Sequence, residues 1–221
     1  MDSGVRYAAA LDAALIYLSE SHQLDVDDKS CEMLAAFLKL LLKWNRVYNL
    51  TAVRDPVDMI WRHLVDSLIL CRWLPDKANK AALQHDVVDI GSGAGLPVLP
   101  LAIVRSDLQF VSVESNGKKT RFQQQVLVEL GLRNVQIINQ RVQNVDLKSP
   151  FVTSRAFTAP ADFLNIARPL CAENAVVAIM LAQTAMLPEA LPAPFSLQEI
   201  VPVHIPDTLA LRHIALCRCL A

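Results

Sequence analysis

The sequence predicts an α/β fold: a mostly parallel sheet with an antiparallel hairpin at its end, preceded by an N-terminal helical cap. Three observations predict it. Apolar residues recur at helical spacing over the first seventy-odd residues, short apolar strands alternate with helices after residue 85, and three of the six glycines cluster where a strand meets a helix. We expect two units, a helical cap over residues 1–75 and a sheet domain over residues 76–221.

The expected cap consists of about three helices. The first includes the apolar positions of residues 8–18, and Asp27 and Asp28 can cap a second helix whose wide apolar stripe covers residues 33–42. Asp55-Pro56 is typical of a helix start with proline in the first turn, and that third helix continues towards Trp73.

Strands and helices then alternate. Strands are expected at 86–90, 109–114, 135–138, 152–155 and 175–181, and helices from Pro97, at 117–130 and at 160–167. Such alternation implies crossover connections and a parallel sheet that is covered on both faces. The final strands, at 196–204 and 212–220, are separated by Pro206-Asp207-Thr208 and form a hairpin-like finish.

The composition excludes several classes of protein. Apolar residues make up 53% of the chain and charged residues 19%, which excludes a disordered tail or a coiled coil. The longest uncharged stretches, 90–104 and 174–188, are shorter than the roughly 20 residues that span a bilayer. The five cysteines are odd in number and form no CxxC pair, which is typical of reduced thiols. We expect a cytoplasmic, monomeric protein with no bound metal and no membrane contact.

The net charge of −1 conceals a segregated distribution. Residues 39–73 contain six basic and three acidic residues, and residues 115–155 contain seven basic and two acidic residues. These segments could form a local face for an anionic ligand, or they could be ordinary solvated helix surfaces.

The glycine cluster, Asp89-Ile90-Gly91-Ser92-Gly93-Ala94-Gly95, lies between an expected strand and an expected helix. Ligands of open parallel sheets bind beyond the carboxyl ends of the strands. A dinucleotide fingerprint needs a sixth-position glycine, and Leu96 stands there. The spacing instead resembles the first motif of class I S-adenosylmethionine (AdoMet) methyltransferases. Asp89 offers favourable charge to that cofactor, and Glu114, which ends the second strand, can accept hydrogen bonds from both ribose hydroxyls.

Three longer motifs, at residues 44–56, 62–67 and 91–97, resemble the ribosomal RNA small subunit methyltransferase G family, also called glucose-inhibited division protein B. Shorter segments at 117–122, 141–142, 154–157 and 212–213 are similar to it too, so the resemblance runs from about Leu34 to the carboxyl end. It implies a Rossmann-like class I methyltransferase fold. It also implies AdoMet-dependent methylation of N7 of one guanosine, guanosine 527, in the 530 loop of bacterial 16S rRNA, free or within the small ribosomal subunit.

The resemblance also implies a set of site residues. AdoMet is expected at Asp89, Gly91, Ser92, Gly93, Gly95, Leu96, Glu114, Val142, Gln143 and Arg155. Arg155 would lie at the edge between cofactor and substrate and is the candidate for positioning either. Our candidates for RNA phosphates are Lys118, Lys119, Arg121 and Arg141, with solvated surface residues as the alternative.

No catalytic base is expected. Guanine N7 carries an in-plane lone pair and no proton, so positioning and electrostatics suffice for methyl transfer. His63 is expected to be a structural or substrate-orienting residue, because its helix places it near Arg62 and Asp66.

The sequence departs from the family pattern in three places. Phe151-Val152-Thr153 is shortened by two residues, Ala182-Gln183 stands where a lysine-glycine pair is usual, and Val98 replaces a glycine. The missing lysine leaves an alternative open, a catalytically weakened methyltransferase-fold factor that binds RNA or the ribosome. A small-molecule methyltransferase would leave the two basic segments unexplained.

Overall fold

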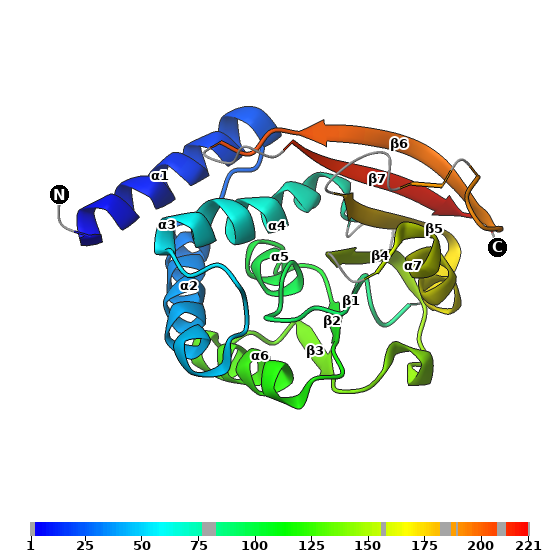
Figure 1. Cartoon of the computed structure of the whole chain (residues 1–221), viewed down its shortest axis with the longest axis horizontal. Coiled ribbons are helices and arrows are strands. Elements are labelled where there is room, and N and C mark those ends of the chain that lie inside the picture. The colour runs from blue at the N-terminus through cyan, green and yellow to red at the C-terminus, as the bar shows by residue number, and fades with distance from the viewer. Residues whose placement is uncertain are drawn as a thin grey trace.

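The computed structural model describes residues 3–76, 83–155, 158–181, 187–188, 190–206 and 211–220. Within them, seven strands form one sheet in the order β3-β2-β1-β4-β5-β7-β6 (Figure 1). Strands β1 to β5 pair in parallel, whereas β7 is antiparallel to both β5 and β6. The predicted parallel sheet with a terminal hairpin is therefore confirmed. The strands are β1 (Val87–Ile90), β2 (Phe110–Val113), β3 (Val135–Ile138), β4 (Ser149–Arg155), β5 (Cys171–Leu181), β6 (Phe195–Val203) and β7 (Arg212–Cys219).

Helices precede the sheet and connect its strands. The N-terminal ones are α1 (Ser3–His22), α2 (Asp28–Tyr48), α3 (Pro56–Met59), the π-helix η1 (Ile60–Val65), α4 (Asp66–Leu68) and the 3-10 helix η2 (Ile69–Trp73). Those between the strands are α5 (Val98–Val104), α6 (Gly117–Leu130), the 3-10 helix η4 (Val142–Asn144), α7 (Pro160–Ala167) and the 3-10 helix η5 (Arg168–Leu170).

The predicted caps at Asp27 and Asp55 are confirmed, whereas Asp28 is the first residue of α2. The Asp27 carboxylate accepts a hydrogen bond from the Ser30 backbone N–H at 2.7 Å, at the start of α2. The Asp55 carboxylate accepts from two backbone N–H groups of the first turn of α3. These bonds satisfy donors that have no partner inside a helix. The helix predicted from Asp55 towards Trp73 is a continuous helical run whose middle is the π-helix η1.

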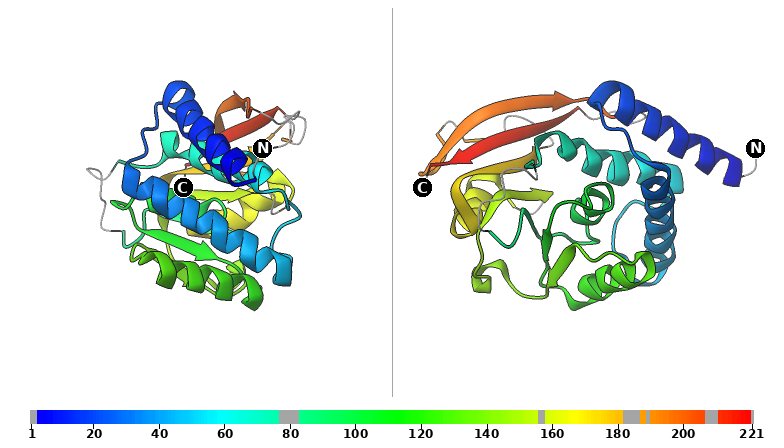
Figure 2. Two further views of the ribbon diagram at one scale, coloured as in Figure 1. Left: turned by 90° about the vertical axis from the view of Figure 1, so that its left-hand side faces the viewer. Right: turned by 180° about the vertical axis from the view of Figure 1, so that it is seen from behind.

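The sheet is covered on both faces, as the strand alternation predicts. On one face, strand residues such as Val87 and Phe110 belong to an apolar cluster with α5 and α6, and the N-terminal helices pack onto the same cluster (Figures 1 and 2). On the other face, Val88 and Val111 belong to a cluster with α7. Successive strand residues point to opposite faces, so every central strand contributes to both clusters.

Two strands begin earlier than expected. Strand β4 begins at Ser149 and β5 at Cys171, and their register shifts between Ser149 and Phe151. The first part of β5 exposes Glu173 and Asn174, so its sequence lacks the apolar alternation that predicts a strand. The expected turn residues Asp207 and Thr208, and the departure Ala182-Gln183, lie outside the described residues.

The described residues show what the protein offers to a membrane or a metal ion. None of their helices is long and apolar enough to cross a membrane. They contain no group of three or more His, Cys, Asp or Glu side chains able to hold a metal ion. All five cysteines are free thiols, and Cys171, Cys217 and Cys219 are buried.

Candidate functional site

The glycine cluster forms a tight loop at the carboxyl end of β1. The backbone N–H groups of Gly91 and Ser92 donate to the Val113 carbonyl oxygen at 2.8 and 3.3 Å, which ties the loop to β2. Gly91, Gly93 and Gly95 all have positive φ, and a Cβ atom on Gly95 would lie 2.3 Å from Leu99 Cδ1. Glycine adopts a positive φ without steric cost, which explains all three glycines, and at Gly95 a side chain would also clash with Leu99.

The amide of Gln123 fixes the same loop from below. This side chain of α6 is fully buried, and its Nε2 donates to the Gly93 carbonyl oxygen at 2.8 Å. Its Oε1 accepts from the Ser112 hydroxyl at 2.5 Å. The amide therefore connects β2, α6 and the glycine loop. The sequence signal for it is one polar residue on the buried face of an amphipathic helix, which our sequence reasoning missed.

Asp89, in β1 beneath the loop, is a fully buried carboxylate whose charge is only partly compensated. It is 0% exposed, and neither of its oxygens forms a close hydrogen bond within the described part of the chain. Burial raises the pKa of Asp89 to about 7, although weaker interactions with the Ser92 side chain, the Val98 backbone N–H and the positive charge of Arg155 act in the opposite direction. A buried acceptor of this kind is costly unless a ligand satisfies it.

Glu114 directly follows β2 and faces the loop. Its Oε2 accepts from the Gly93 backbone N–H and its Oε1 from the Asn116 backbone N–H, both at 2.8 Å. The side chain is buried. Each carboxylate oxygen has two acceptor sites, so Glu114 keeps capacity for two further donors such as ribose hydroxyls.

A cavity of about 430 Å³ opens beside Glu114 at the carboxyl edge of β1, β2 and β3. This size lies within the range of small-molecule sites. Six of the predicted site residues line it: Gly91, Glu114, Lys119, Arg141, Val142 and Gln143. We refer to this as the loop cavity.

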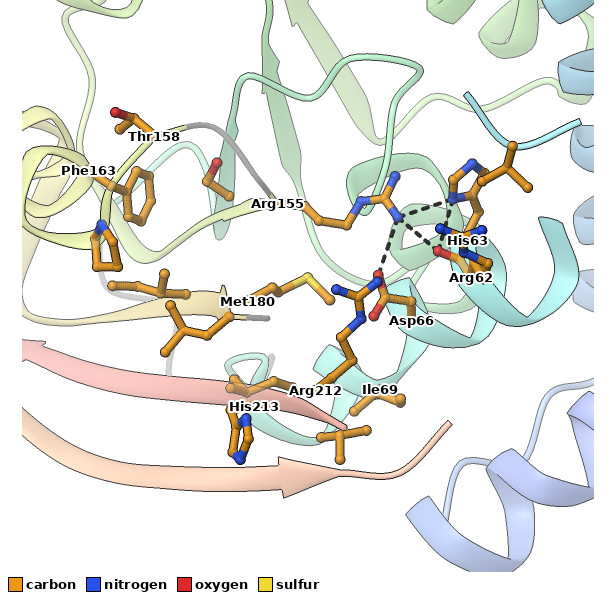
Figure 3. A pocket seen from close by; sticks show the side chains of 17 residues that line it. Arg62, His63, Asp66, Ile69, Arg155, Thr158, Phe163, Met180, Arg212 and His213 are labelled. Carbon is orange, nitrogen blue, oxygen red and sulfur yellow. Dashed lines mark hydrogen bonds and ion pairs between the residues drawn. The ribbon is translucent and has the colours of Figure 1, made fainter. Parts of the chain in front are cut away.

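A second cavity, of about 300 Å³, lies at the ends of β4 and β5, beneath η1 and the terminal hairpin. We refer to it as the arginine cavity. Figure 3 shows Arg155, at the end of β4, and Arg212, at the start of β7, with Asp66 between them. His63 and His213 line it as well.

Arg155 holds the upper part of the arginine cavity together. Its Nη1 donates to the Arg62 carbonyl oxygen at 3.0 Å and to Asp66 Oδ2 at 3.2 Å (Figure 3). Burial raises the pKa of Asp66, and the charges of Arg155 and Arg212 partly counter this. The ion pair is shielded from water, since the side chains of Arg155 and Asp66 are only 21% and 6% exposed.

His63 is neutral and already bonded at both nitrogens. Its Nδ1 lies 2.9 Å from the Arg62 carbonyl oxygen and 3.2 Å from Arg155 Nη1, so it donates to the first or accepts from the second, depending on the tautomer. Nε2 lies 2.7 Å from the Thr51 hydroxyl, which can donate or accept to match. Burial, together with the charge of Arg155, lowers the pKa of His63 to about 4. These contacts suit the structural or orienting role predicted for it.

The remaining predicted residues lie outside both cavities. Leu96 and Ser92 are buried beneath the loop, Leu96 as part of the apolar cluster that packs on α5 and α6. Lys118 and Arg121 are exposed on α6. The structure thus brings the residues after β1, β2 and β3 to the loop cavity and Arg155 to the arginine cavity, although the charge of Arg155 still acts on Asp89.

Our sequence reasoning did not name Asp66, Arg212 and His213 as site residues. They belong to α4 and β7, which are distant in sequence from each other and from the glycine loop. Only the topology of the sheet, with β7 beside β5, brings them to one place. The departures are accommodated: Val98 begins α5 and is buried, and β4 runs unbroken from Phe151 to Arg155.

Comparison with known proteins gives a consistent result. The sequence model of the family described as rRNA small subunit methyltransferase G matches residues 30–214. A protein of that name from Nitrosomonas eutropha is 41% identical over 84% of this chain and 86% of its own. Another, from an Azoarcus species, is 41% identical over 86% of this chain and 88% of its own.

A solved structure is similar in fold. It is TrmN from Thermus thermophilus, with a TM-score of 0.55 and 15% identity over 76% of this chain and 55% of that one. At this identity the likeness shows a shared fold and nothing more.

Proposed function

The chain belongs to the rRNA small subunit methyltransferase G family, and on this premise we propose that it methylates N7 of a single guanosine of 16S rRNA, with AdoMet as the methyl donor. By analogy with the family, the target is guanosine 527 in the 530 loop. AdoMet-dependent methylation of small-subunit rRNA follows from family membership. The atom and the nucleotide are the parts that we propose.

The residues around the glycine loop fit AdoMet. The observation that carries this is the fully buried carboxylate of Asp89, a negative charge directly beneath the glycine loop that a cationic cofactor would help to compensate. Gly91, Gly93 and Gly95 leave bare backbone above it, and Ser92 and Leu96 hold the loop through the Leu96 N–H to Ser92 carbonyl hydrogen bond of 2.9 Å.

The loop cavity would hold the adenosine part of the cofactor. Glu114 offers acceptors for ribose hydroxyls, and Val142 and Gln143 offer backbone groups and a neutral amide on the adenine side. Arg155 would contact the cofactor or the substrate from the arginine cavity. When bound, AdoMet supplies an electrophilic methyl group on a positively charged sulfur.

The protein's part in the reaction is to orient the base and exclude water. Guanine N7 attacks through its own lone pair, so no side chain has to remove a proton first. His63 is not placed to act as a base, because both of its ring nitrogens already have partners, Nε2 with Thr51 and Nδ1 with Arg62 and Arg155. Its low pKa keeps it neutral at pH 7.

We place the target guanine in the arginine cavity. The Watson–Crick edge of guanine presents two donors, which suit the carboxylate of Asp66, and its O6 atom, beside N7, suits an arginine donor. Asp66 and Arg212 supply these two kinds of group in a half-enclosed space. This arrangement would hold N7 in a fixed direction without acid–base chemistry.

Transfer to unmodified RNA tests the proposal. The purified protein is incubated with AdoMet that carries a labelled methyl group. The substrates, tested separately, are small ribosomal subunits and naked 16S rRNA from a strain that lacks the protein. We expect one methyl group per RNA, and none on RNA from the parent strain. Borohydride and aniline cleave RNA at N7-methylated guanosine, so the position of the break identifies the nucleotide.

Each alternative result has a distinct meaning. Equal, negligible labelling of both RNAs, together with normal heat of AdoMet binding, would favour the catalytically weakened RNA-binding factor. Labelling without aniline cleavage would place the methyl group on another atom. Within the same proposal, residues 1–75 act as a helical cap on the AdoMet-binding domain of residues 76–221, and the protein works as a monomer in the cytoplasm.

A further inference from the structure

The carboxyl end of α2 presents an aromatic pair at the surface. The rings of Trp44 and Tyr48, one helical turn apart, are stacked with centroids 5.2 Å apart and an interplanar angle of 30°. Tyr48 is 44% exposed and the neighbouring Val47 is 69% exposed. Aromatic rings of this size are mostly buried in folded proteins, so an exposed stack needs a reason.

The stack is anchored to the core from behind. The ring of Trp44 lies 5.7 Å from that of Phe122 on α6, and Phe122 in turn lies 6.3 Å from Phe37 on α2. Phe122 and Phe37 are both fully buried. The outer ring of Tyr48 is therefore supported by a column of three aromatic rings, which keeps it in place as a rigid platform.

The two chain segments that form this platform contain basic residues but no acidic ones. Neither residues 39–54 nor residues 115–128 contain an Asp or a Glu. Their basic residues are Lys39, Lys43, Arg46, Arg54, Lys118, Lys119 and Arg121. The contact between Trp44 and Phe122 brings the two segments side by side. All of these basic residues except the half-buried Lys119 are exposed. The nearest acids along the chain are Glu32, Asp55, Glu129 and the buried Glu114.

The platform is connected to both cavities. On the α6 side, Lys119 lines the loop cavity. On the α2 side, the buried amide of Asn45 accepts from the Thr51 N–H at 2.8 Å and donates to the Val53 carbonyl oxygen at 3.0 Å. Thr51 bonds His63, and Val53 lines the arginine cavity. The helices that carry the platform therefore also supply residues that line or support both cavities.

We propose that this surface, consisting of Trp44, Val47, Tyr48, Lys43, Arg46, Lys118 and Arg121, binds unpaired nucleotides next to the target guanosine. A base stacks on Tyr48 and the flanking phosphates lie against the basic residues. The inference rests on the proposed function, since it assigns the docking face of the same RNA. Base stacking on an aromatic side chain is tolerant of sequence and needs an unstacked base, so the partner is a single-stranded loop and not a duplex.

Two variants test the two halves of this surface. Tyr48→Ala removes the stacking partner, whereas the double variant Lys43→Gln/Arg46→Gln removes charge and leaves the rings. The probe is a fluorescent, unmethylated RNA hairpin with the target loop, compared by anisotropy with a fully paired duplex of equal length. Tyr48→Ala should weaken hairpin binding about tenfold and duplex binding hardly at all, and Tyr48→Phe should restore it.

The salt dependence of RNA binding measures the contribution of the basic residues of this surface. Each lost phosphate contact lowers the slope of log affinity against log salt by about 0.7 for a single strand, so the double variant should lose about 1.4. The matched control is Lys29→Gln/Arg133→Gln, which removes two exposed charges. Lys29 lies in the first turn of α2 and Arg133 follows the last turn of α6, so each lies at the end of its helix away from the basic residues of the platform. Its slope should equal that of the unmodified protein, and calorimetry should show normal AdoMet binding in every variant.

The outcomes separate this inference from the proposed function. If Tyr48→Ala binds the hairpin and methylates it with an unchanged KM, the surface is wrong and the proposed function stands. If the hairpin binds in a Tyr48-dependent way but accepts no methyl group, the surface stands and the proposed function fails. Unchanged RNA binding in all variants would mean that the exposed rings serve another partner, such as a protein, and would overturn the inference.

Discussion

The loop cavity and the arginine cavity lie at the same edge of the sheet but are built differently. The loop cavity is formed by short segments that directly follow β1, β2 and β3, and its key contacts are to backbone groups. The arginine cavity depends on side chains such as Arg155 and Asp66, which are 89 positions apart. We therefore expect the loop cavity to be sensitive to a larger side chain at its glycines, and the arginine cavity to the loss of a charged side chain.

The largest effect is expected from bulk in the loop. Gly93→Val places a branched side chain on a residue with φ +58°, above the carboxylate of Asp89 and beside Lys119. The side chain would occupy space that the cofactor needs. We expect AdoMet affinity to fall at least about 100-fold, or about 3 kcal/mol, as measured by calorimetry. Charge interactions in the arginine cavity should not change.

Gly131→Val is the matched control for backbone strain. Gly131 ends α6 with φ +64°, and a Cβ atom there would meet nothing within 4 Å. This variant should lose about 1 to 2 kcal/mol of stability but keep its AdoMet affinity. An equal loss of affinity in both variants would show that strain alone, and not the position of the loop, explains the result.

The next effect is expected from lost charge in the arginine cavity. Arg155→Ala leaves Asp66 as a buried carboxylate without its ion-pair partner, which should cost about 3 kcal/mol of unfolding free energy at pH 8. Burial already raises the pKa of Asp66 in the folded state, and removal of Arg155 raises it further. The folded state then holds a proton that the unfolded state has lost, so the cost grows as pH rises above about 4.

Urea unfolding at pH 5 and pH 8 checks this expectation. The cost of Arg155→Ala should be clearly smaller at pH 5, where Asp66 can be protonated. The double variant Arg155→Ala/Asp66→Asn removes the stranded charge and should recover most of the loss at pH 8. A cost that is the same at both pH values would contradict an electrostatic origin.

The same difference between the two cavities explains which parts of the site could be predicted from the sequence. The glycine loop, Asp89 and Glu114 follow strands that have clear apolar patterns, so their shared edge is predictable from the parallel alternation alone. Arg212 begins β7, and nothing in its local sequence indicates that β7 inserts between β5 and β6. The start of β5 was missed because exposed polar residues interrupt it. Local chemistry was therefore predictable, and charge pairs across the fold were not.

The smallest effect concerns Asp89, whose ionisable side chain is fully buried beneath the glycine loop. Because its pKa is about 7 when folded and near 3.8 when unfolded, the folded protein loses stability as pH rises from about 4 to 7, and the loss then levels off. That difference amounts to at most about 4 kcal/mol. Asp89→Asn removes the charge but leaves an amide that also lacks partners, so we expect a gain of about 2 kcal/mol at pH 8 and none near pH 4.

The gain in stability should accompany a loss of AdoMet binding, since a neutral amide attracts the cationic cofactor less. Asp86→Asn is the matched control, because Asp86 Oδ2 already accepts from the Gln109 N–H at 2.7 Å and its charge is compensated. It should give no gain in stability and no change in affinity. If Asp89→Asn destabilised the protein at pH 8, the carboxylate would have a structural partner, and the loop cavity would depend on side-chain charge as the arginine cavity does.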